Sequence, residues 1–177
     1  AKIAVVDNAT AVYSQGVTDV YAKFHNGSGG ISDDLKEVKK DDADVDITIS
    51  DGNTTAMDAA TLHNIGNATT GDVTVTNAAA ISGKYEDVTK AIVDGATKVL
   101  AAKSTITISD ADTTAMTAVT LHKIGNATTG DVSVTNAAAI SGDYADLKKA
   151  LVDGGTKVVL KKASTPITIG NVVNVDE

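Results

Sequence analysis

The chain has 177 residues, with 15 lysines, no arginine and 23 acidic residues, so its formal net charge at neutral pH is −8. Because there is no cysteine, disulfides, thiolate nucleophiles and cysteine-ligated metal centres are excluded. The acidic charge and the lack of a lysine-rich run speak against nucleic-acid binding, and no segment approaches the roughly 20 apolar residues of a membrane-spanning helix.

Residues 1–46 are expected to form an N-terminal cap. Ile3–Val6 is apolar and β-branched and predicts a strand. A helical stripe is predicted from the spacing of Tyr13, Val17, Val20, Tyr21 and Phe24. Ser32–Lys40 predicts a short helix, since acids stand at its start and lysines at its end, the order that the helix dipole favours. Large side chains and an irregular plan are typical of the end of a repeat stack, although a separate functional domain is the alternative.

A tandem duplication organises the rest of the chain. Residues 47–99 match residues 106–158 at a constant offset of 59, with 41 identities in 53 positions. We therefore divide the chain into a cap (1–46), repeat 1 (47–105), repeat 2 (106–166) and a truncated third repeat (167–177). The last segment begins with Ile167-Thr-Ile-Gly170, which resembles the start of the two full repeats.

Each repeat reads as strand, helix, strand, helix, strand. In repeat 1, Ile47–Ser50 and Val73–Thr76 alternate β-branched and polar residues as strands do. Thr55–Ile65 predicts a helix that Gly66 ends, and Tyr85, Val88 and Ile92 predict a second helix that closes at Asp94-Gly95. Short strands at Lys98–Leu100 and Lys157–Leu160 complete the two repeats.

Strands that are joined by helices are expected to lie parallel with right-handed crossovers. The sequence therefore predicts an α/β protein with a mainly parallel sheet of about eight short strands and small helices packed on it. Two arrangements fit this pattern, a solenoid-like stack of repeats and a gently twisted layered sheet. Such stacks have unpaired strand edges at their ends, and the alternating segment Ile167–Val175 is expected to close its own sheet or to pair with the edge of another molecule.

The repeat ITISDADTTAMTAVTLHKIGNATTGDVSVTNAAAISGDYADLKKALVDGGTKV resembles the Ala/Thr/Asp-rich tandem repeats of very large secreted bacterial surface proteins, adhesin-like or S-layer-like, of marine bacteria and cyanobacteria. The resemblance covers Ile47 to about Ile169, some 70% of the chain. It implies an extracellular or cell-surface location. Members of that group often carry calcium-binding Gly-Gly-x-Gly-x-Asp nonapeptides, which Gly27-Ser-Gly-Gly-Ile-Ser-Asp33 matches only in part and without repetition.

Two sets of residues are candidate metal ligands. His63 and His122 are equivalent positions of the two repeats and His25 is the third imidazole. Equivalent positions two strand spacings apart are expected to lie about 10 Å from each other, too far for one zinc ion, so partly exposed helix histidines are the favoured interpretation. Asp51, Asn53, Asp110 and Asp112 lie between a strand and a helix. Calcium takes six to eight oxygen ligands, so we expect these residues to cap helices, with calcium the one cofactor that the pattern admits.

The remaining candidates point to turns and surfaces. Asn-x-Ser/Thr triplets at Asn8, Asn26, Asn53, Asn67 and Asn126 are glycosylation acceptors in a suitable host, and turn residues by default. Gly83-Lys84-Tyr85 lacks the rest of a phosphate-binding loop. The acidic pair Glu86-Asp87 becomes Ala145-Asp146 in repeat 2, so it does not indicate a shared catalytic site. We assign no catalytic, cofactor-binding or metal-binding residue and expect no enzyme activity.

The leading functional hypothesis is a structural, self-associating extracellular protein of a surface layer, filament or adhesin stalk, which associates through its sheet edges. The alternatives are a module that binds glycans or another cell surface, which the scarcity of aromatic side chains disfavours, and a structural protein of a virion or its tail.

Overall fold

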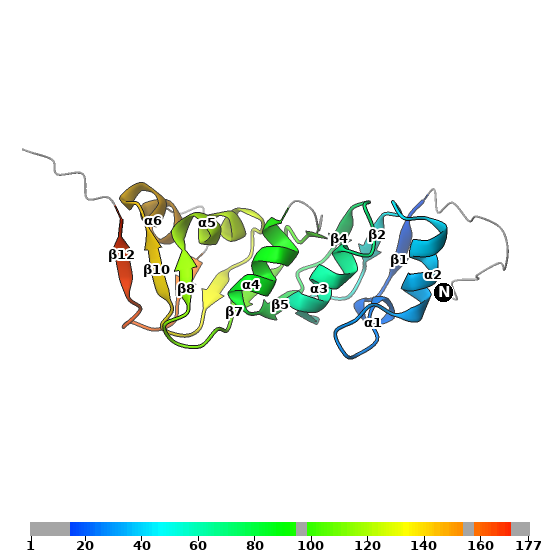
Figure 1. Cartoon of the computed structure of the whole chain (residues 1–177), viewed down its shortest axis with the longest axis horizontal. Coiled ribbons are helices and arrows are strands. Elements are labelled where there is room, and N and C mark those ends of the chain that lie inside the picture. The colour runs from blue at the N-terminus through cyan, green and yellow to red at the C-terminus, as the bar shows by residue number, and fades with distance from the viewer. Residues whose placement is uncertain (1–14, 95–98, 154–157, 171–177) are drawn as a thin grey trace, which may run out of the picture.

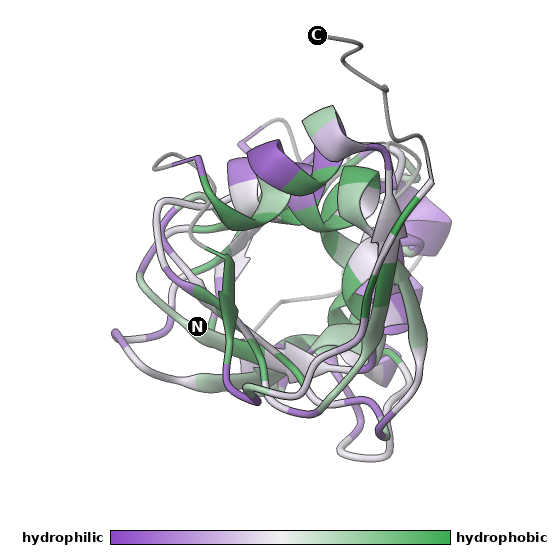
Figure 2. Ribbon diagram, turned by 90° about the vertical axis from the view of Figure 1, so that its left-hand side faces the viewer, coloured by the Kyte–Doolittle hydropathy of each residue, from purple (hydrophilic) through white to green (hydrophobic). Residues whose placement is uncertain are grey.

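The protein is a mixed α/β structure with three sheets of parallel strands. This computed structural model describes residues 15–94, 99–153 and 158–170. Figure 1 shows an elongated molecule in which the helices α1 and α2 lie at one end of the long axis and β12 lies at the other. Viewed along that axis, the strands and helices surround a common centre (Figure 2). None of the described helices combines the length and the apolar character needed to cross a membrane.

Six α-helices and one π-helical segment lie in the described part of the chain. They are α1 (Tyr21–Phe24), α2 (Asp33–Asp41), α3 (Ala59–Gly66), α4 (Tyr85–Val88), which continues as the π-helical η1 (Thr89–Val93), α5 (Ala118–Asn126) and α6 (Tyr144–Leu151). The hydroxyl of Ser32 caps α2 by accepting a hydrogen bond from the amide of Leu35, so the predicted helix at Ser32–Lys40 is confirmed.

The described strands form three sheets. The N-terminal sheet has the order β1 (Val17–Asp19), β2 (Ile47–Ile49), β4 (Val73–Val75) and β6 (Val99–Leu100). The central sheet has the order β11 (Val158–Leu160), β9 (Val132–Val134), β7 (Thr105–Ile108), β5 (Ala80–Gly83) and β3 (Ala56–Asp58). The C-terminal sheet has the order β12 (Ile167–Ile169), β10 (Ala139–Gly142) and β8 (Ala115–Thr117). All strand pairs in these sheets are parallel, as the sequence predicted.

Equivalent strands of the two repeats lie in different sheets. β2 of repeat 1 belongs to the N-terminal sheet, whereas its counterpart β7 belongs to the central sheet. Likewise β3 lies in the central sheet and its counterpart β8 in the C-terminal sheet. The helices move with them: α3 and α4 lie along the front of the molecule in Figure 1, and α5 and α6 lie along its top. The prediction of one sheet with about eight strands was therefore wrong.

Two segments differ from their predicted structure. Thr55–Ile65 was predicted as one helix, but Ala56–Asp58 forms strand β3 and the helix begins at Ala59. Met57 alone of these three strand residues is buried, so the segment has the alternation of a strand, and it pairs with β5. Val17–Asp19 was predicted within a helical stripe, but it pairs in register with Ile47–Ile49 as strand β1. Tyr13 and Ile3–Val6 lie outside the described residues.

Small apolar side chains fill the centre of the molecule. In the N-terminal sheet, Ile47, Val73 and Val99 stand in register and are at most 4% exposed. The outward positions between them carry threonine, as at Thr48 and Thr74. Close packing extends to the helices, since a Cβ atom on Gly83 would lie 2.8 Å from the Cβ of Ala59. The core thus consists of thin layers of Val, Ile, Ala and Leu, with Phe24 as its largest fully buried side chain.

Candidate functional site: the tyrosine clamps and the C-terminal end

Two of the three aspartates considered for calcium binding, Asp51 and Asp110, each cap a helix that lies earlier in the chain. Asp110 accepts a hydrogen bond at 2.5 Å from the amide of Tyr85, at the start of α4. Asp51 accepts one at 2.5 Å from the amide of Tyr21, at the start of α1. The prediction that these residues cap the helix that follows them was wrong, because Asp58 and Thr117 cap α3 and α5. The carboxylates link successive layers of the fold instead.

The hydroxyl groups of the same two tyrosines contact the next strand. The amide of Thr117 donates a hydrogen bond to the Tyr85 hydroxyl at 3.1 Å, and the amide of Asp58 donates one to the Tyr21 hydroxyl at 3.1 Å. Each tyrosine is therefore held at its backbone amide by a turn and at its hydroxyl by a strand, and both come 25 to 37 residues later. We call this arrangement a tyrosine clamp. The clamp was not predicted from the sequence, although Tyr and Asp recur at related positions.

The turns that supply the clamps are also held together by asparagine and aspartate side chains. Asn77 donates to the carbonyl oxygen of Asp51 at 2.5 Å, and Asn136 donates to that of Asp110 at 2.6 Å. The side-chain oxygens of Asn53 and Asp112 accept hydrogen bonds from the amides of Ala78 and Ala137. These polar groups therefore have partners within the protein. Among the described residues there is no group of three or more His, Cys, Asp or Glu side chains that is arranged to hold a metal ion.

The histidines lie apart from one another in separate local contacts. The Nε2 atoms of His63 and His122 lie 3.0 Å from the side-chain nitrogens (Nδ2) of Asn67 and Asn126, which come one helical turn later. The Nδ1 atom of each of these two rings is buried and has no hydrogen-bond partner in the described structure. The Nδ1 atom of His25 accepts from the amide of Gly27. The structure does not bring these rings together.

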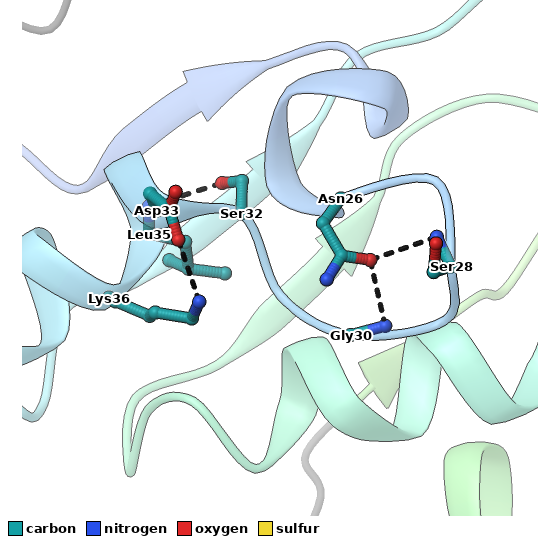
Figure 3. Close-up of polar contacts among 7 residues, drawn as sticks. All are labelled: Asn26, Ser28, Gly30, Ser32, Asp33, Leu35 and Lys36. Carbon is teal, nitrogen blue, oxygen red and sulfur yellow. Dashed lines mark hydrogen bonds and ion pairs between the residues drawn. The ribbon is translucent and has the colours of Figure 1, made fainter.

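The glycine-rich segment Gly27–Asp33 is organised by its own side chains. The carboxamide oxygen of Asn26 accepts hydrogen bonds from the amides of Ser28 and Gly30 (Figure 3). Asp33 lies at the start of α2 and pairs with Lys36 at 2.7 Å, which lowers the pKa of the Asp33 carboxyl below its usual value. The oxygen atoms of this segment therefore serve the turn and the helix and do not converge on a common centre.

Three of the glycosylation triplets also have structural roles. Asn53, Asn67 and Asn126 are exposed, but their side chains make the contacts described above. The hydroxyl groups of Thr69 and Thr128, which complete two of the triplets, are buried and donate to the carbonyl oxygens of Val45 and Ser104. Asn8 lies outside the described residues.

A shallow cleft of about 490 Å³ lies beside Tyr85, between α4 and the start of α5. Its lining includes Glu86, Lys90, Asp110 and Thr117. Lys90 donates to Glu86 at 2.6 Å, and this pair lowers the pKa of the glutamate and raises that of the lysine. The cleft combines an aromatic side chain with hydroxyl and charged groups. No nucleophile and base are paired in it.

The third tyrosine of the series lies at the C-terminal end of the described chain. Tyr144 occupies in repeat 2 the position of Tyr85 in repeat 1, and it is 63% exposed, against 8% for Tyr21. Ile167 and Ile169 of β12 are 49% and 46% exposed, although β12 pairs with β10 as a strand. The predicted strand in the third repeat is confirmed for Ile167–Ile169, and Asn171–Val175 lies outside the described residues.

Comparison of the chain with models of protein families, with characterised proteins and with solved structures finds no match. The function is therefore argued from the chemistry and geometry of the described residues.

Proposed function

We propose that the protein is a structural, self-associating component of an extracellular assembly, such as a surface layer, a filament or an adhesin stalk. In this proposal it is not an enzyme, and its structural unit is one coil of a solenoid. The observation that carries the proposal is the in-register pairing of parallel strands along the molecule, which ends in the exposed strand β12.

The registers support a solenoid with coils of similar length. Strand partners are 26 residues apart where Ile47 pairs with Val73 and Ile106 with Val132, and 24 apart where Ala56 pairs with Ala80. Each coil of this solenoid has three sides, and a strand or a helix forms each side. The 59-residue repeat therefore spans two coils and one additional side. That additional side accounts for the shift of equivalent strands to the next sheet. Inward-facing side chains that are in register on neighbouring strands pack against one another. Each coil therefore buries the apolar face of the coil before it.

The composition of the surface supports a structural role. The outward positions of the strands carry Thr and Ser, and the tyrosine clamps and Asn-containing turns use most of the polar groups that sequence analysis singled out. The resemblance to repeats of secreted bacterial surface proteins supports an extracellular location and remains a proposal. The proposal includes no calcium site, and calcium is added only as one condition of the experiment below.

The test is sedimentation velocity together with negative-stain electron microscopy, from micromolar to millimolar protein, with and without millimolar calcium. We expect species that grow with concentration into ordered filaments or sheets. A single monomeric species at all concentrations in both conditions would exclude self-association through the ends of the molecule.

The cleft beside Tyr85 favours a second candidate, a module that binds a glycan on a cell surface. An aromatic edge with hydroxyl and carboxylate groups is a common setting for sugars. This candidate predicts glycan-array signals that are lost in a Glu86→Ala variant, and an array without signals would reject it.

A further inference from the structure

We infer that Asn26 and Gly27 form a self-modifying site, at which the Asn26 carboxamide is converted through a cyclic imide into aspartate and isoaspartate, with water as the only co-reactant. The site lies in the loop of residues 25–31, between α1 and α2. The reaction needs no second copy of the chain, so this inference is independent of the proposed self-association.

Asn26 is the only asparagine of the chain that precedes glycine. Ring closure joins the backbone nitrogen of the next residue to the carboxamide carbon, and glycine has no Cβ atom to obstruct that approach. Gly27 has a φ of 78°, and a Cβ atom built on it would meet no atom within 4 Å beyond its chain neighbours. Both residues are exposed, so water can reach the ring that forms.

A base contacts the attacking nitrogen. The amide of Gly27 donates a hydrogen bond to Nδ1 of His25 at 2.9 Å, so the imidazole already holds the proton that must leave this nitrogen. The His25 ring is half-buried and lies against Tyr21, with ring centroids 4.4 Å apart. Imidazole is the side chain best suited to take up and return a proton near neutral pH. His25 is therefore placed as the general base.

Two backbone donors hold the carboxamide oxygen. The Oδ1 atom of Asn26 accepts hydrogen bonds from the amides of Ser28 at 2.9 Å and Gly30 at 3.1 Å (Figure 3). Attack on the carboxamide carbon moves negative charge onto this oxygen, and paired N–H groups stabilise such charge as in an oxyanion hole. The same two bonds fix the orientation of the carboxamide before the reaction begins.

The loop is tied to the rest of the fold. His25 and Ile31 form an antiparallel bridge that closes it. The side chain of Asn64 in α3 donates to the carbonyl oxygen of Gly29 at 2.8 Å, which joins the loop to repeat 1. The reacting groups are thus preorganised by long-range contacts that the unfolded chain lacks.

The atoms of the reaction balance without a further reagent. His25 takes the Gly27 amide proton as the nitrogen forms a bond to the Asn26 carboxamide carbon. The imidazolium then gives that proton to Nδ2, which leaves as ammonia, and a five-membered imide remains. One water molecule opens either carbonyl of the ring to give aspartate or isoaspartate, and the new carboxyl group ionises at neutral pH.

The two products differ in their effect on the loop. The aspartate side chain can still accept from the amides of Ser28 and Gly30, and its charge strengthens both hydrogen bonds. Isoaspartate lengthens the main chain by one carbon atom, which shifts Gly29 relative to Asn64. Either product removes the amide that a glycan would need at the Asn26 triplet.

The test follows the full chain by mass spectrometry during incubation at neutral pH. Trypsin releases residues 24–36 as a peptide in which Asn26 is the only asparagine, and its conversion to the acid raises the peptide mass. We expect Asn26 to convert faster in the folded protein than in the same protein unfolded in urea. A folded rate equal to or below the unfolded rate would overturn the inference.

Asn53 is the internal reference for this measurement. It is exposed, and its carboxamide oxygen also accepts a hydrogen bond from a backbone amide, that of Ala78, but the residue after it is Thr54. Its conversion in the same folded samples should be much slower than that of Asn26. Similar rates at the two positions would show that the loop has no special reactivity.

The variant His25→Phe tests the base. It keeps an aromatic ring beside Tyr21 but removes the acceptor of the Gly27 proton, so conversion of Asn26 in the folded protein should slow about tenfold or more. The matched control is His122→Phe, the same change at a histidine of α5 in repeat 2, which should leave the rate unchanged. Melting temperatures verify that both variants fold.

Hydrogen exchange of the Ser28 and Gly30 amides shows whether the loop of His25→Phe keeps its structure. An unchanged rate of conversion with both amides still protected would exclude His25 as the base. If the variant loosens the loop, the comparison of folded and unfolded wild-type protein decides the inference by itself.

Discussion

The hydroxyl of Ser104 is buried with no hydrogen-bond partner among the described residues, while Val45 occupies the equivalent position 59 residues earlier, one repeat length away. A buried hydroxyl that lacks a partner costs free energy, and valine has nearly the same shape. We expect Ser104→Val to raise the free energy of unfolding by about 1 kcal/mol, measured by urea denaturation. The reverse change, Val45→Ser, should lower it by a similar amount, and equal stabilities of all three proteins would contradict the argument.

Thr54 and Thr113 share a left-handed backbone conformation, with φ of 66° and 67°. This conformation is unfavourable for a β-branched residue and acceptable for asparagine. Thr113→Asn is expected to raise the free energy of unfolding by about 0.5–1 kcal/mol, and the same change at Thr54 should add independently. Thermal and urea unfolding of the single and double variants measure this. Thr113→Val keeps the branched side chain and should bring no gain.

The buried ring of Tyr21 predicts a loss of stability at high pH. Burial raises the pKa of the Tyr21 hydroxyl above its usual value of 10.0, partly offset by hydrogen bonds. Because the folded protein holds this proton more tightly than the unfolded chain, its contribution is complete below about pH 10 and disappears as the pH rises through the folded pKa. Urea denaturation between pH 8 and about 11 should show a steeper decline for the wild type than for Tyr21→Phe. Parallel curves would show that the Tyr21 proton is not involved.

At the scale of elements, the contribution of the tyrosine clamp at α4 to the free energy of unfolding can be measured. Asp110→Ala removes the acceptor for the Tyr85 amide at the start of this helix, and the loss of an N-terminal cap costs about 1 kcal/mol. Asp131→Ala is the matched control, since it makes the same change of charge at an exposed side chain with no hydrogen bond in the described structure. Urea denaturation should show a clear loss for the first variant and little change for the second.

The sequence predicted some elements well because their residues favour one structure strongly. The strands at Ile47–Ile49 and Val73–Val75 are β-branched and alternating, and α2 carries its own cap and charge pattern. The strands β3 and β5 were missed because Ala, the Asp of β3 and the Gly of β5 have low strand propensity, and the structure of both strands depends on pairing with neighbouring layers. The spacing of apolar residues within one segment does not indicate which other strands that segment pairs with.

The candidate site was predicted less well than the fold for the same reason. Asp51 and Asp110 were recognised as capping residues, but the helices they cap lie 30 and 25 residues earlier in the chain. Motif reasoning considers neighbours in sequence, so it could not assign these partners. The division of the strands into three sheets likewise depends on where the chain turns between strands.

At the scale of the whole molecule, stability is expected to vary along the long axis. β7 pairs on both sides within the central sheet, with Ile106 and Ile108 buried, whereas all three residues of β12 are exposed. Amide hydrogen exchange followed by mass spectrometry should therefore show the slowest exchange in β7 and its neighbours and the fastest in β12. Uniform protection along the chain would indicate that it opens only as a single unit.

The shift of equivalent strands from one sheet to the next has a consequence for any longer array of such repeats. In the proposed solenoid, each repeat that is added in this way would turn the helices by one side of the coil, as α5 and α6 are turned relative to α3 and α4. The array therefore has the symmetry of a threefold screw, and a given surface feature returns to the same side only at every third repeat. Neighbouring rods would then touch at intervals and not along a continuous stripe, which favours open, porous lattices over dense sheets.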